Sequence, residues 1–163
     1  MPPYFFYMDN YIKNYYNRFM NTNNQFELIQ SEFKLTQQQM DKYDTLLYQI
    51  KTWVVTIWVA LSSWSFQSKT KEILILSIFI VLTFWFLDAY NKNVRQDYKN
   101  RRDEIASALK IYFQTDTLPK DFVSPDLPEH KTIETIKHLF RPHVFLLYLT
   151  LIIISLLIYS FVF

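Results

Sequence analysis

The 163-residue sequence contains no cysteine and no glycine. Without cysteine the chain can form neither a disulfide framework nor a thiolate metal site. Without glycine it lacks the loops that cradle phosphates, the nucleophile elbow of hydrolases and the GxxxG motif of membrane helix pairs. These absences exclude several classes of enzyme and one common mode of helix dimerisation.

Neither sign of charge predominates. The chain has 17 Lys and Arg residues and 15 Asp and Glu residues, which gives a formal net charge of +2. Basic and acidic residues are interspersed, so we expect no nucleic acid as a partner. Half of the residues are hydrophobic and 19% are aromatic, and the apolar residues gather in runs between charged segments. This distribution predicts an integral membrane protein with a substantial water-exposed portion.

An amphipathic, aromatic-rich segment is predicted at residues 1–24, with a short helix over residues 10–20. Its apolar face carries Tyr15, Tyr16 and Phe19. Such a face suits the headgroup boundary of a bilayer, where tyrosine offers an apolar ring and a wet hydroxyl. Packing of the same face on a neighbouring helix or subunit is equally compatible with the pattern.

Residues 25–113 dominate the predicted fold, which is an all-α membrane protein. Two apolar crossings, at about 52–68 and 72–88, are joined by a short polar turn that makes the two helices antiparallel. Both crossings continue without Gly or Pro into amphipathic helices that we expect to form a cytoplasmic stalk. The crossings are short for a bilayer, so flanking Lys and Trp residues extend them or the bilayer thins locally.

The stalk carries a heptad-like apolar seam on its first helix and a matching stripe on its second. We expect the two to pair within the chain, and any uncovered part to drive self-association. Thr36 interrupts the seam and forms a capping box with Gln39, so a break there and a continuous helix are both open. Arg101 interrupts the stripe and is expected to pack its stem while its head stays in water. The residues predicted for self-association through the stalk are Phe33, Met40, Tyr43, Leu47, Ile50, Val94, Tyr98 and Ile105.

Residues 114–141 are predicted to form a Pro-containing cytoplasmic loop followed by a short helix. Residues 142–163 are predicted to form a third transmembrane helix, since Pro142 is placed to begin a helix and no charge follows it. Lys and Arg concentrate after the second crossing and before the third. The positive-inside rule then places the N-terminus in the cytoplasm and the C-terminus outside.

The histidines are the strongest enzymatic candidate in the sequence. His130, Glu134 and His138 are spaced four apart on one helix face, and two His with a carboxylate are the ligands of many zinc sites. The HExxH spacing is absent and His130 lies at the start of the helix, so we expect a solvated or membrane-proximal face instead. No other catalytic set can be assembled. We therefore predict no enzymatic activity and no cofactor.

Weakly polar residues mark one face of the first crossing, namely Thr52, Thr56, Ala60 and Ser63. Such a face usually packs against another helix, and lining a pore is the alternative. Asp88, at the end of the second crossing, either pairs with Lys92 in its own helix or forms an acidic ring at a pore mouth in an assembly. Ionisable residues are absent from the depth of the crossings, which disfavours transporters.

The run from Ile50 to Trp58, followed by Phe84-Trp85-Phe86-Leu87-Asp88-Ala89-Tyr90 and a basic helix, resembles a group of small bacterial membrane proteins with a two-helix hairpin. In plan the chain is similar to the SLATT-type membrane effectors of bacterial defence systems. The third crossing and the aromatic N-terminal helix depart from that plan. The resemblance implies assembly in the membrane and its permeabilisation. Together with the stalk and the lack of catalytic groups, it predicts a non-enzymatic, self-associating inner-membrane effector of a bacterial defence or stress system, controlled by a cytoplasmic partner or signal through the stalk. The alternative is a membrane anchor or assembly subunit of a larger complex.

Overall fold

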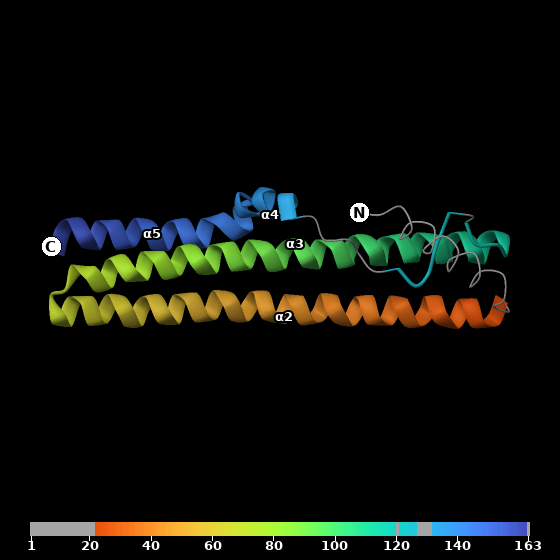
Figure 1. Ribbon diagram of the computed structural model, residues 1–163, viewed down its shortest axis with the longest axis horizontal. Coiled ribbons are helices and arrows are strands. Elements are labelled where there is room, and N and C mark those ends of the chain that lie inside the picture. Colours follow the sequence, from red (N-terminus) through yellow and green to blue (C-terminus); the bar gives the residue numbers. More distant parts are fainter. Residues whose placement is uncertain (1–21, 120, 127–131, 163) are drawn as a thin grey trace, which may run out of the picture. The chain divides into compact units, whose positions relative to one another are not determined.

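The computed structural model of the chain describes residues 22–119, 121–126 and 132–162. The described residues form four helices and no strand (Figure 1), which confirms the all-α fold class. The helix predicted over residues 10–20 lies outside the described residues. The helices are α2 (Thr22–Ser68), α3 (Lys71–Thr115), α4 (Thr132–Leu139) and α5 (Pro142–Val162).

The chain divides into two compact units. Unit 1 consists of the described residues of Met1–Gln38 and Tyr98–Pro128, and unit 2 of those of Gln39–Asp97 and Glu129–Phe163. The helices α2 and α3 each contribute to both units, whereas α4 and α5 belong to unit 2. Each unit is described separately below.

Helix α2 is continuous through Thr36, so the break that the capping box allowed does not occur. Thr36 is buried, and its hydroxyl donates a hydrogen bond of 2.8 Å to the backbone carbonyl of Glu32, one turn earlier. A threonine bonded in this way satisfies its hydroxyl inside a helix, where it needs no cap. The absence of Gly and Pro along the helix removes the other causes of a break.

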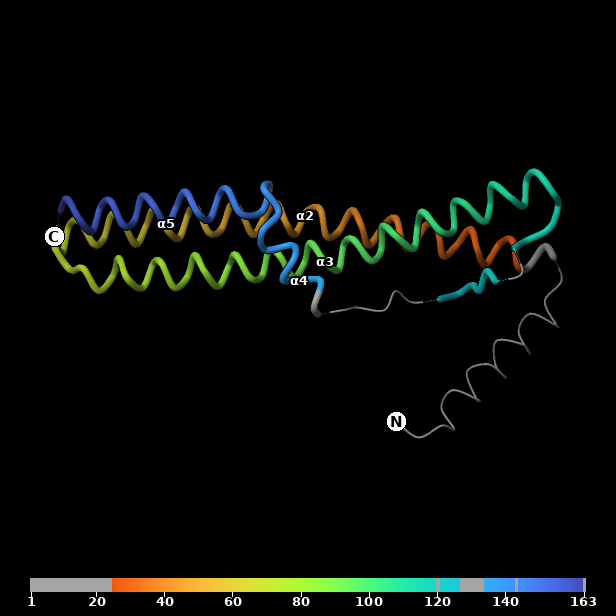
Figure 2. Tube along the Cα trace, turned by 90° about the horizontal axis from the view of Figure 1, so that it is seen from above, coloured from red at the N-terminus to blue at the C-terminus, as the bar shows by residue number. Residues whose placement is uncertain are grey.

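The turn between α2 and α3 places Lys69 at a φ of 51°, in the left-handed region that usually takes glycine at a helix end. In this glycine-free chain a lysine occupies that position. The Ser65 hydroxyl donates to the Thr70 carbonyl at 2.9 Å, and the Thr70 amide donates to the Ser65 carbonyl at 3.3 Å. In unit 2 the two helices run in opposite directions from this turn, with the C-terminal end of α5 beside it (Figures 1 and 2).

The core of unit 2 lies where α5 packs against α2 and α3. Two indole groups bond the elements together: Trp58 donates to the Ser155 hydroxyl at 2.8 Å, and Trp85 donates to the Leu139 carbonyl at 3.1 Å. The Trp85 ring also stacks on Tyr148 with centroids 6.4 Å apart. The buried apolar residues of this core are Val54, Val81, Ala89, Val144, Tyr148 and Leu151.

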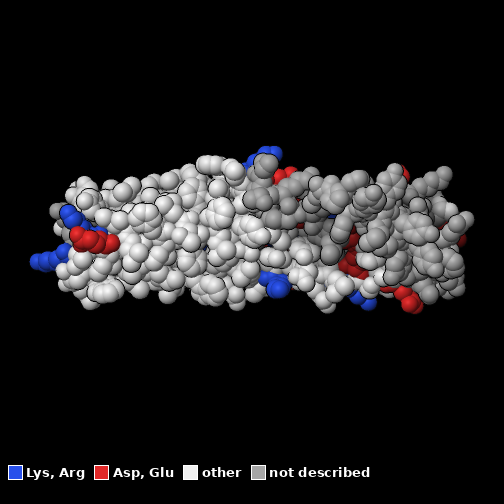
Figure 3. Space-filling view, viewed as in Figure 1, with Lys and Arg blue, Asp and Glu red and all other residues white. Residues whose placement is uncertain are grey.

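Two helices of the described residues are long and apolar enough to cross a membrane, namely α3 and residues Val144–Val162 of α5. Only 28% and 22% of their most apolar stretches are buried, whereas the core helix of a soluble protein is mostly buried. Figure 3 shows an uncharged band over α5 and the adjacent part of α3. Helix α2, which contains the predicted crossing at 52–68, is not one of the two.

Unit 1 packs the beginning of α2 against the last turns of α3. Phe26 stacks on Tyr112 with ring centroids 5.9 Å apart and meets Phe113 edge-on at 6.0 Å. Ile29 and Ile105 are buried nearby, at 3% and 0% exposure. At the end of α3 the chain turns through Asp116, whose φ of 56° is again left-handed. The loop that follows returns across the two helices, as the contacts of Arg101 show below.

Candidate functional site

The residues predicted for stalk association are largely covered by their own chain. Four of them are buried, namely Met40, Leu47, Ile50 and Ile105, and four are half-buried, namely Phe33, Tyr43, Val94 and Tyr98. Pairing within the chain was the expected use of the seam, and this burial agrees with it. Self-association through the four half-buried residues stays a prediction.

The weakly polar face of α2 is exposed. Thr52, Thr56, Ala60 and Ser63 all lie on the surface of unit 2. The Thr52 hydroxyl donates to the Tyr48 carbonyl at 3.1 Å, and the Thr56 hydroxyl donates to the Thr52 carbonyl at 2.9 Å. Because the Thr52 and Thr56 hydroxyls are satisfied within the helix, these two residues can meet lipid or another helix without leaving their donors unpaired.

Asp88 does not form the predicted pair with Lys92, whereas an acidic ring in an assembly stays a prediction. Its side chain is buried, with 1% exposure, and among the described residues it forms no ion pair with Lys92. Neither carboxylate oxygen nor the Tyr148 hydroxyl reaches good hydrogen-bond geometry with a described residue. A buried carboxylate held in this way has unused capacity to accept hydrogen bonds.

A cavity of about 240 Å³ lies beside Asp88, where α2, α3 and α5 meet in unit 2. Charged and apolar side chains both line the cavity. One of the lining residues, Tyr48, is 72% exposed, so the cavity is open to the surroundings on that side. The lining residues are Asp44, Leu47, Tyr48, Lys51, Asp88, Lys92 and Val144. Sequence patterns singled out Asp88 and Leu47 for other roles and gave no indication of this cavity.

At the rim of the cavity Asp44 is already paired. The Arg95 guanidinium donates to both of its carboxylate oxygens, with a distance of 2.8 Å for the Nη2 contact. This hydrogen bonding from Arg95 lowers the pKa of Asp44, although partial burial opposes the shift. Because the two opposite charges compensate each other in this bidentate pair, neither residue is well placed to attract a charged ligand. The other charged residues that line the cavity are Lys51, Asp88 and Lys92.

In unit 1, Glu32 and Arg101 form a buried ion pair, with Arg101 Nε donating to Glu32 at 2.8 Å. The Glu32 side chain is 11% exposed and the Arg101 side chain 5% exposed. The expectation that the guanidinium of Arg101 stays in water was therefore wrong. Arg101 also reaches Glu104 at 2.9 Å. The partner that makes burial possible, Glu32, is 69 residues away in the sequence. A buried guanidinium requires such pairing because its desolvation is costly.

The same ion pair holds the loop that follows α3. Arg101 donates to the Val123 carbonyl at 2.6 Å and lies over the Phe122 ring at 5.3 Å from its centroid. The Ser124 hydroxyl and the Asp126 amide both donate to the Glu32 carboxylate. Three segments of unit 1, namely α2, α3 and the loop after α3, are thus joined at one buried point. The Pro-containing loop is therefore bound to the stalk helices of unit 1 through charged groups.

Of the helix face that carries His130, Glu134 and His138, the structure shows His138 buried. This residue is 2% exposed and its Nδ1 atom is buried without a partner among the described residues, so it is not on a solvated face. The nearby Thr135 is also buried, and Asn93 of α3 donates a hydrogen bond of 3.1 Å to its hydroxyl. Glu134 is half-buried, and His130 lies outside the described residues. In the described part of the chain no group of three or more His, Asp or Glu residues could hold a metal ion.

Acidification should destabilise the fold through His138. Burial lowers the pKa of His138, the positive charges of Arg141 and Lys92 lower it further, and Glu134 and Asp97 oppose them. Near pH 6.5 His138 therefore binds a proton in the unfolded chain but not in the folded chain. As the pH drops below that value, the free energy of unfolding decreases. The decrease has a limit of about 1.4 kcal/mol per pH unit.

The measurement is the thermal unfolding of the detergent-purified chain from pH 7.5 down to pH 5. His138→Gln keeps the size of the side chain but cannot ionise, so its unfolding temperature should depend less on pH over this interval. An equal pH dependence in the two proteins would show that other groups are responsible.

Comparisons of the chain with family models, with curated proteins and with solved structures find no match. Its function is therefore argued from its own residues. Three features are available for that argument: an exposed weakly polar face on α2, a charged cavity beside Asp88, and a loop fixed to a buried ion pair.

Proposed function

We propose that the chain is a multi-pass protein of the inner membrane that crosses the bilayer three times, at about 52–68, 72–88 and 142–163. The first two crossings form an antiparallel hairpin that extends into a cytoplasmic stalk, with the N-terminus in the cytoplasm and the C-terminus outside. The exposed apolar surface of α3 and α5 supports this placement, as does the distribution of Lys and Arg.

Hydroxyl groups on the exposed surfaces of these segments support the same placement. Thr83 donates to the Phe79 carbonyl at 2.9 Å, and Thr150 donates to the Leu146 carbonyl at 2.8 Å. Thr52 and Thr56 form the same type of bond. In hydrocarbon an unpaired donor is costly, so hydroxyls bonded back to their own helix are compatible with contact to lipid.

We further propose that copies of the chain associate in the membrane and permeabilise it, as the non-enzymatic effector of a bacterial defence or stress system. The observation that supports this best is the exposed face of Thr52, Thr56, Ala60 and Ser63, because the apolar seam beside it is already covered within the chain. Small and hydroxyl side chains let a second helix approach closely, and they can line a weakly polar pore. A cytoplasmic partner would act through the stalk and the loop bound to Glu32 and Arg101.

The test is induced expression in bacteria with a dye that reports the membrane potential. Depolarisation by the wild-type chain is expected, with the trigger or partner supplied if one is needed. Ala60→Leu should reduce both depolarisation and the cross-linked oligomer, because the larger side chain keeps a second helix away. Val59→Leu is the matched control, since Val59 is exposed in the same helix and already large. Unchanged polarisation in the presence of the trigger would overturn the proposal, and stoichiometric copurification of other subunits would favour the anchor.

A further inference from the structure

The buried guanidinium of Arg101 binds two successive residues of the loop after α3. The Val123 carbonyl accepts a hydrogen bond of 2.6 Å from Arg101 Nη2, and the centroid of the Phe122 ring lies 5.3 Å from the guanidinium carbon. Every residue of a peptide offers a backbone carbonyl, whereas only an aromatic residue offers a ring face to a cation. Arg101 therefore favours a segment in which an aromatic side chain precedes the bonded carbonyl.

The carboxylate of Glu32 binds the next part of the same loop. The Ser124 hydroxyl donates to its Oε2 atom, and the Asp126 backbone amide donates to its Oε1 atom at 3.2 Å. Oε1 also accepts from Arg101 Nε at 2.8 Å, so the ion pair fixes the direction of the carboxylate. Hydrogen bonds to an ionised acceptor are stronger than those between neutral groups. The ion pair thus contacts an aromatic ring, a hydroxyl two positions later and a backbone amide two positions after that.

The loop contributes no buried side chain to unit 1 over its described residues. None of residues 116–119 and 121–126 is buried, whereas Glu32 and Arg101 both are. Removal of the loop from the helices would therefore lose little apolar burial. The two charges would remain paired with each other, and water would reach them. Because segments with few buried apolar contacts open most easily, the loop is an exchangeable cover of the ion pair.

We propose that Glu32 and Arg101 form a peptide-binding site, which residues 122–126 of the same chain occupy, and that a cytoplasmic protein displaces them with a segment of its own. That segment carries an aromatic residue and, two positions later, Ser or Thr, because these side chains complement the guanidinium and the carboxylate. Displacement would free the connection between α3 and α4, which leads to the third proposed crossing. This regulatory role rests on the proposed function, whereas the peptide-binding site itself does not.

The experiment measures binding of a fluorescent peptide, with the sequence of residues 119–128, to the full chain purified in detergent. In the wild-type chain the tethered loop competes with the peptide at a high effective concentration. Phe122→Ala/Ser124→Ala removes the ring and the hydroxyl from the tethered loop. Fluorescence anisotropy should therefore show this variant binding the peptide about tenfold more tightly than the wild type does, or tighter still. A peptide with the same two replacements should bind neither protein.

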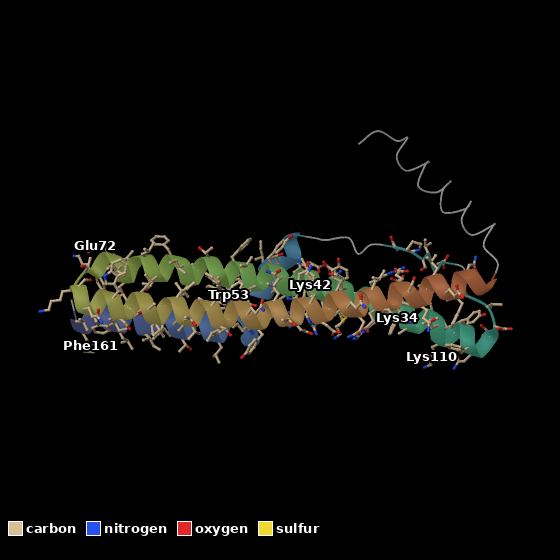
Figure 4. The ribbon with its side chains drawn as sticks, turned by 90° about the horizontal axis from the view of Figure 1, so that it is seen from below. Lys34, Lys42, Trp53, Glu72, Lys110 and Phe161 are labelled. Carbon is tan, nitrogen blue, oxygen red and sulfur yellow. The ribbon has the colours of Figure 1, made fainter. Side chains whose placement is uncertain are left out.

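Two further changes, each added to Phe122→Ala/Ser124→Ala, locate the site. Glu32→Met/Arg101→Met removes both charges and should abolish peptide binding, and thermal unfolding shows whether this protein is folded. The altered peptide tests the same contacts without any change in the protein. Lys34→Gln/Lys110→Gln removes positive charge from exposed residues of α2 and α3 in unit 1 (Figure 4). Although the peptide carries one Lys and two Asp residues, this change should leave its binding unchanged.

Equal binding of the peptide by the wild type and by Phe122→Ala/Ser124→Ala would overturn the proposal, as would binding by neither at about 1 mM peptide. Loss of the cross-linked wild-type oligomer on addition of the peptide would also overturn it, because the occupant would then be the loop of a second copy. A chain that depolarises membranes but does not bind the peptide would contradict this inference alone. A chain that binds the peptide but never depolarises membranes would contradict the proposed effector function alone.

Discussion

Arg101→Met is expected to destabilise unit 1 by about 3–5 kcal/mol, the largest effect of any single charge removal in the described part of the chain. The substitution leaves the Glu32 carboxylate buried, with its charge no longer compensated by the guanidinium. It also removes the bond to the Val123 carbonyl and the cation over the Phe122 ring. The loop that these contacts hold should then be released from the helices.

The measurements are the thermal unfolding of the full chain in detergent and its rate of proteolysis within residues 121–126. Glu32→Met/Arg101→Met should recover much of the lost stability, because replacing both members of a buried ion pair with apolar residues is often close to neutral. The same change at Arg95 is the matched control. Arg95 pairs with an Asp44 side chain that is 50% exposed, so Arg95→Met should cost less than about 1 kcal/mol. Equal losses for Arg101→Met and Arg95→Met would contradict the burial argument.

Tyr148→Ala is expected to destabilise unit 2 by about 3–5 kcal/mol. The side chain is fully buried and stacks on Trp85 with an interplanar angle of 12°. Its removal leaves a cavity between α3 and α5 that the aromatic neighbours cannot fill without moving. The contact that attaches α5 to the rest of the core would weaken accordingly.

Unfolding of the detergent-purified variant, followed by tryptophan fluorescence, reports this loss because Trp85 is in the cluster. Tyr159→Ala in the same helix is the control, since Tyr159 is 41% exposed and its loss should change stability by no more than about 0.5 kcal/mol. Tyr148→Phe separates the ring from the hydroxyl. The hydroxyl has no well-formed hydrogen bond, so this variant should change the free energy of unfolding by less than about 1 kcal/mol in either direction. A larger loss from Tyr148→Phe than from Tyr148→Ala would show that the hydroxyl, and not the ring, matters.

The helices and their ends could be predicted from local pattern because the signals for them are local. Pro142 begins α5 as expected, and the run of Pro and Asp residues after α3 ends regular structure near the predicted position. The possible break at Thr36 did not occur, because a capping box is one of two uses for such a threonine. The other use is a hydrogen bond to the carbonyl one turn earlier, which Thr36 forms with Glu32 and exposed threonines of α2 form as well.

The site residues were harder to predict because they depend on contacts between distant segments. Arg101 was expected to keep its head in water, since a stripe on one helix does not reveal an acid on another. A signal was present: Glu32 lies on the apolar seam of α2, next to Phe33, opposite a stripe that carries a lone Arg. A matched acid and base on two facing seams indicate a buried pair. His138 and the cavity gave no such signal, since both depend on how α4 and α5 pack onto α3.

The hydrogen bond from Trp58 to Ser155 joins residues 97 positions apart, and this spacing has a consequence for biosynthesis. The ribosome completes α2 and α3 before the acceptor for the Trp58 indole has been translated. Until α5 arrives, the indoles of Trp58 and Trp85 and the apolar faces around Val54 and Val81 lack their final partners. A ribosome that stalls before α5 would therefore release a chain in which the core face of α2 and α3 in unit 2 is uncovered. Quality-control proteases should recognise such a truncated chain more readily than the finished one.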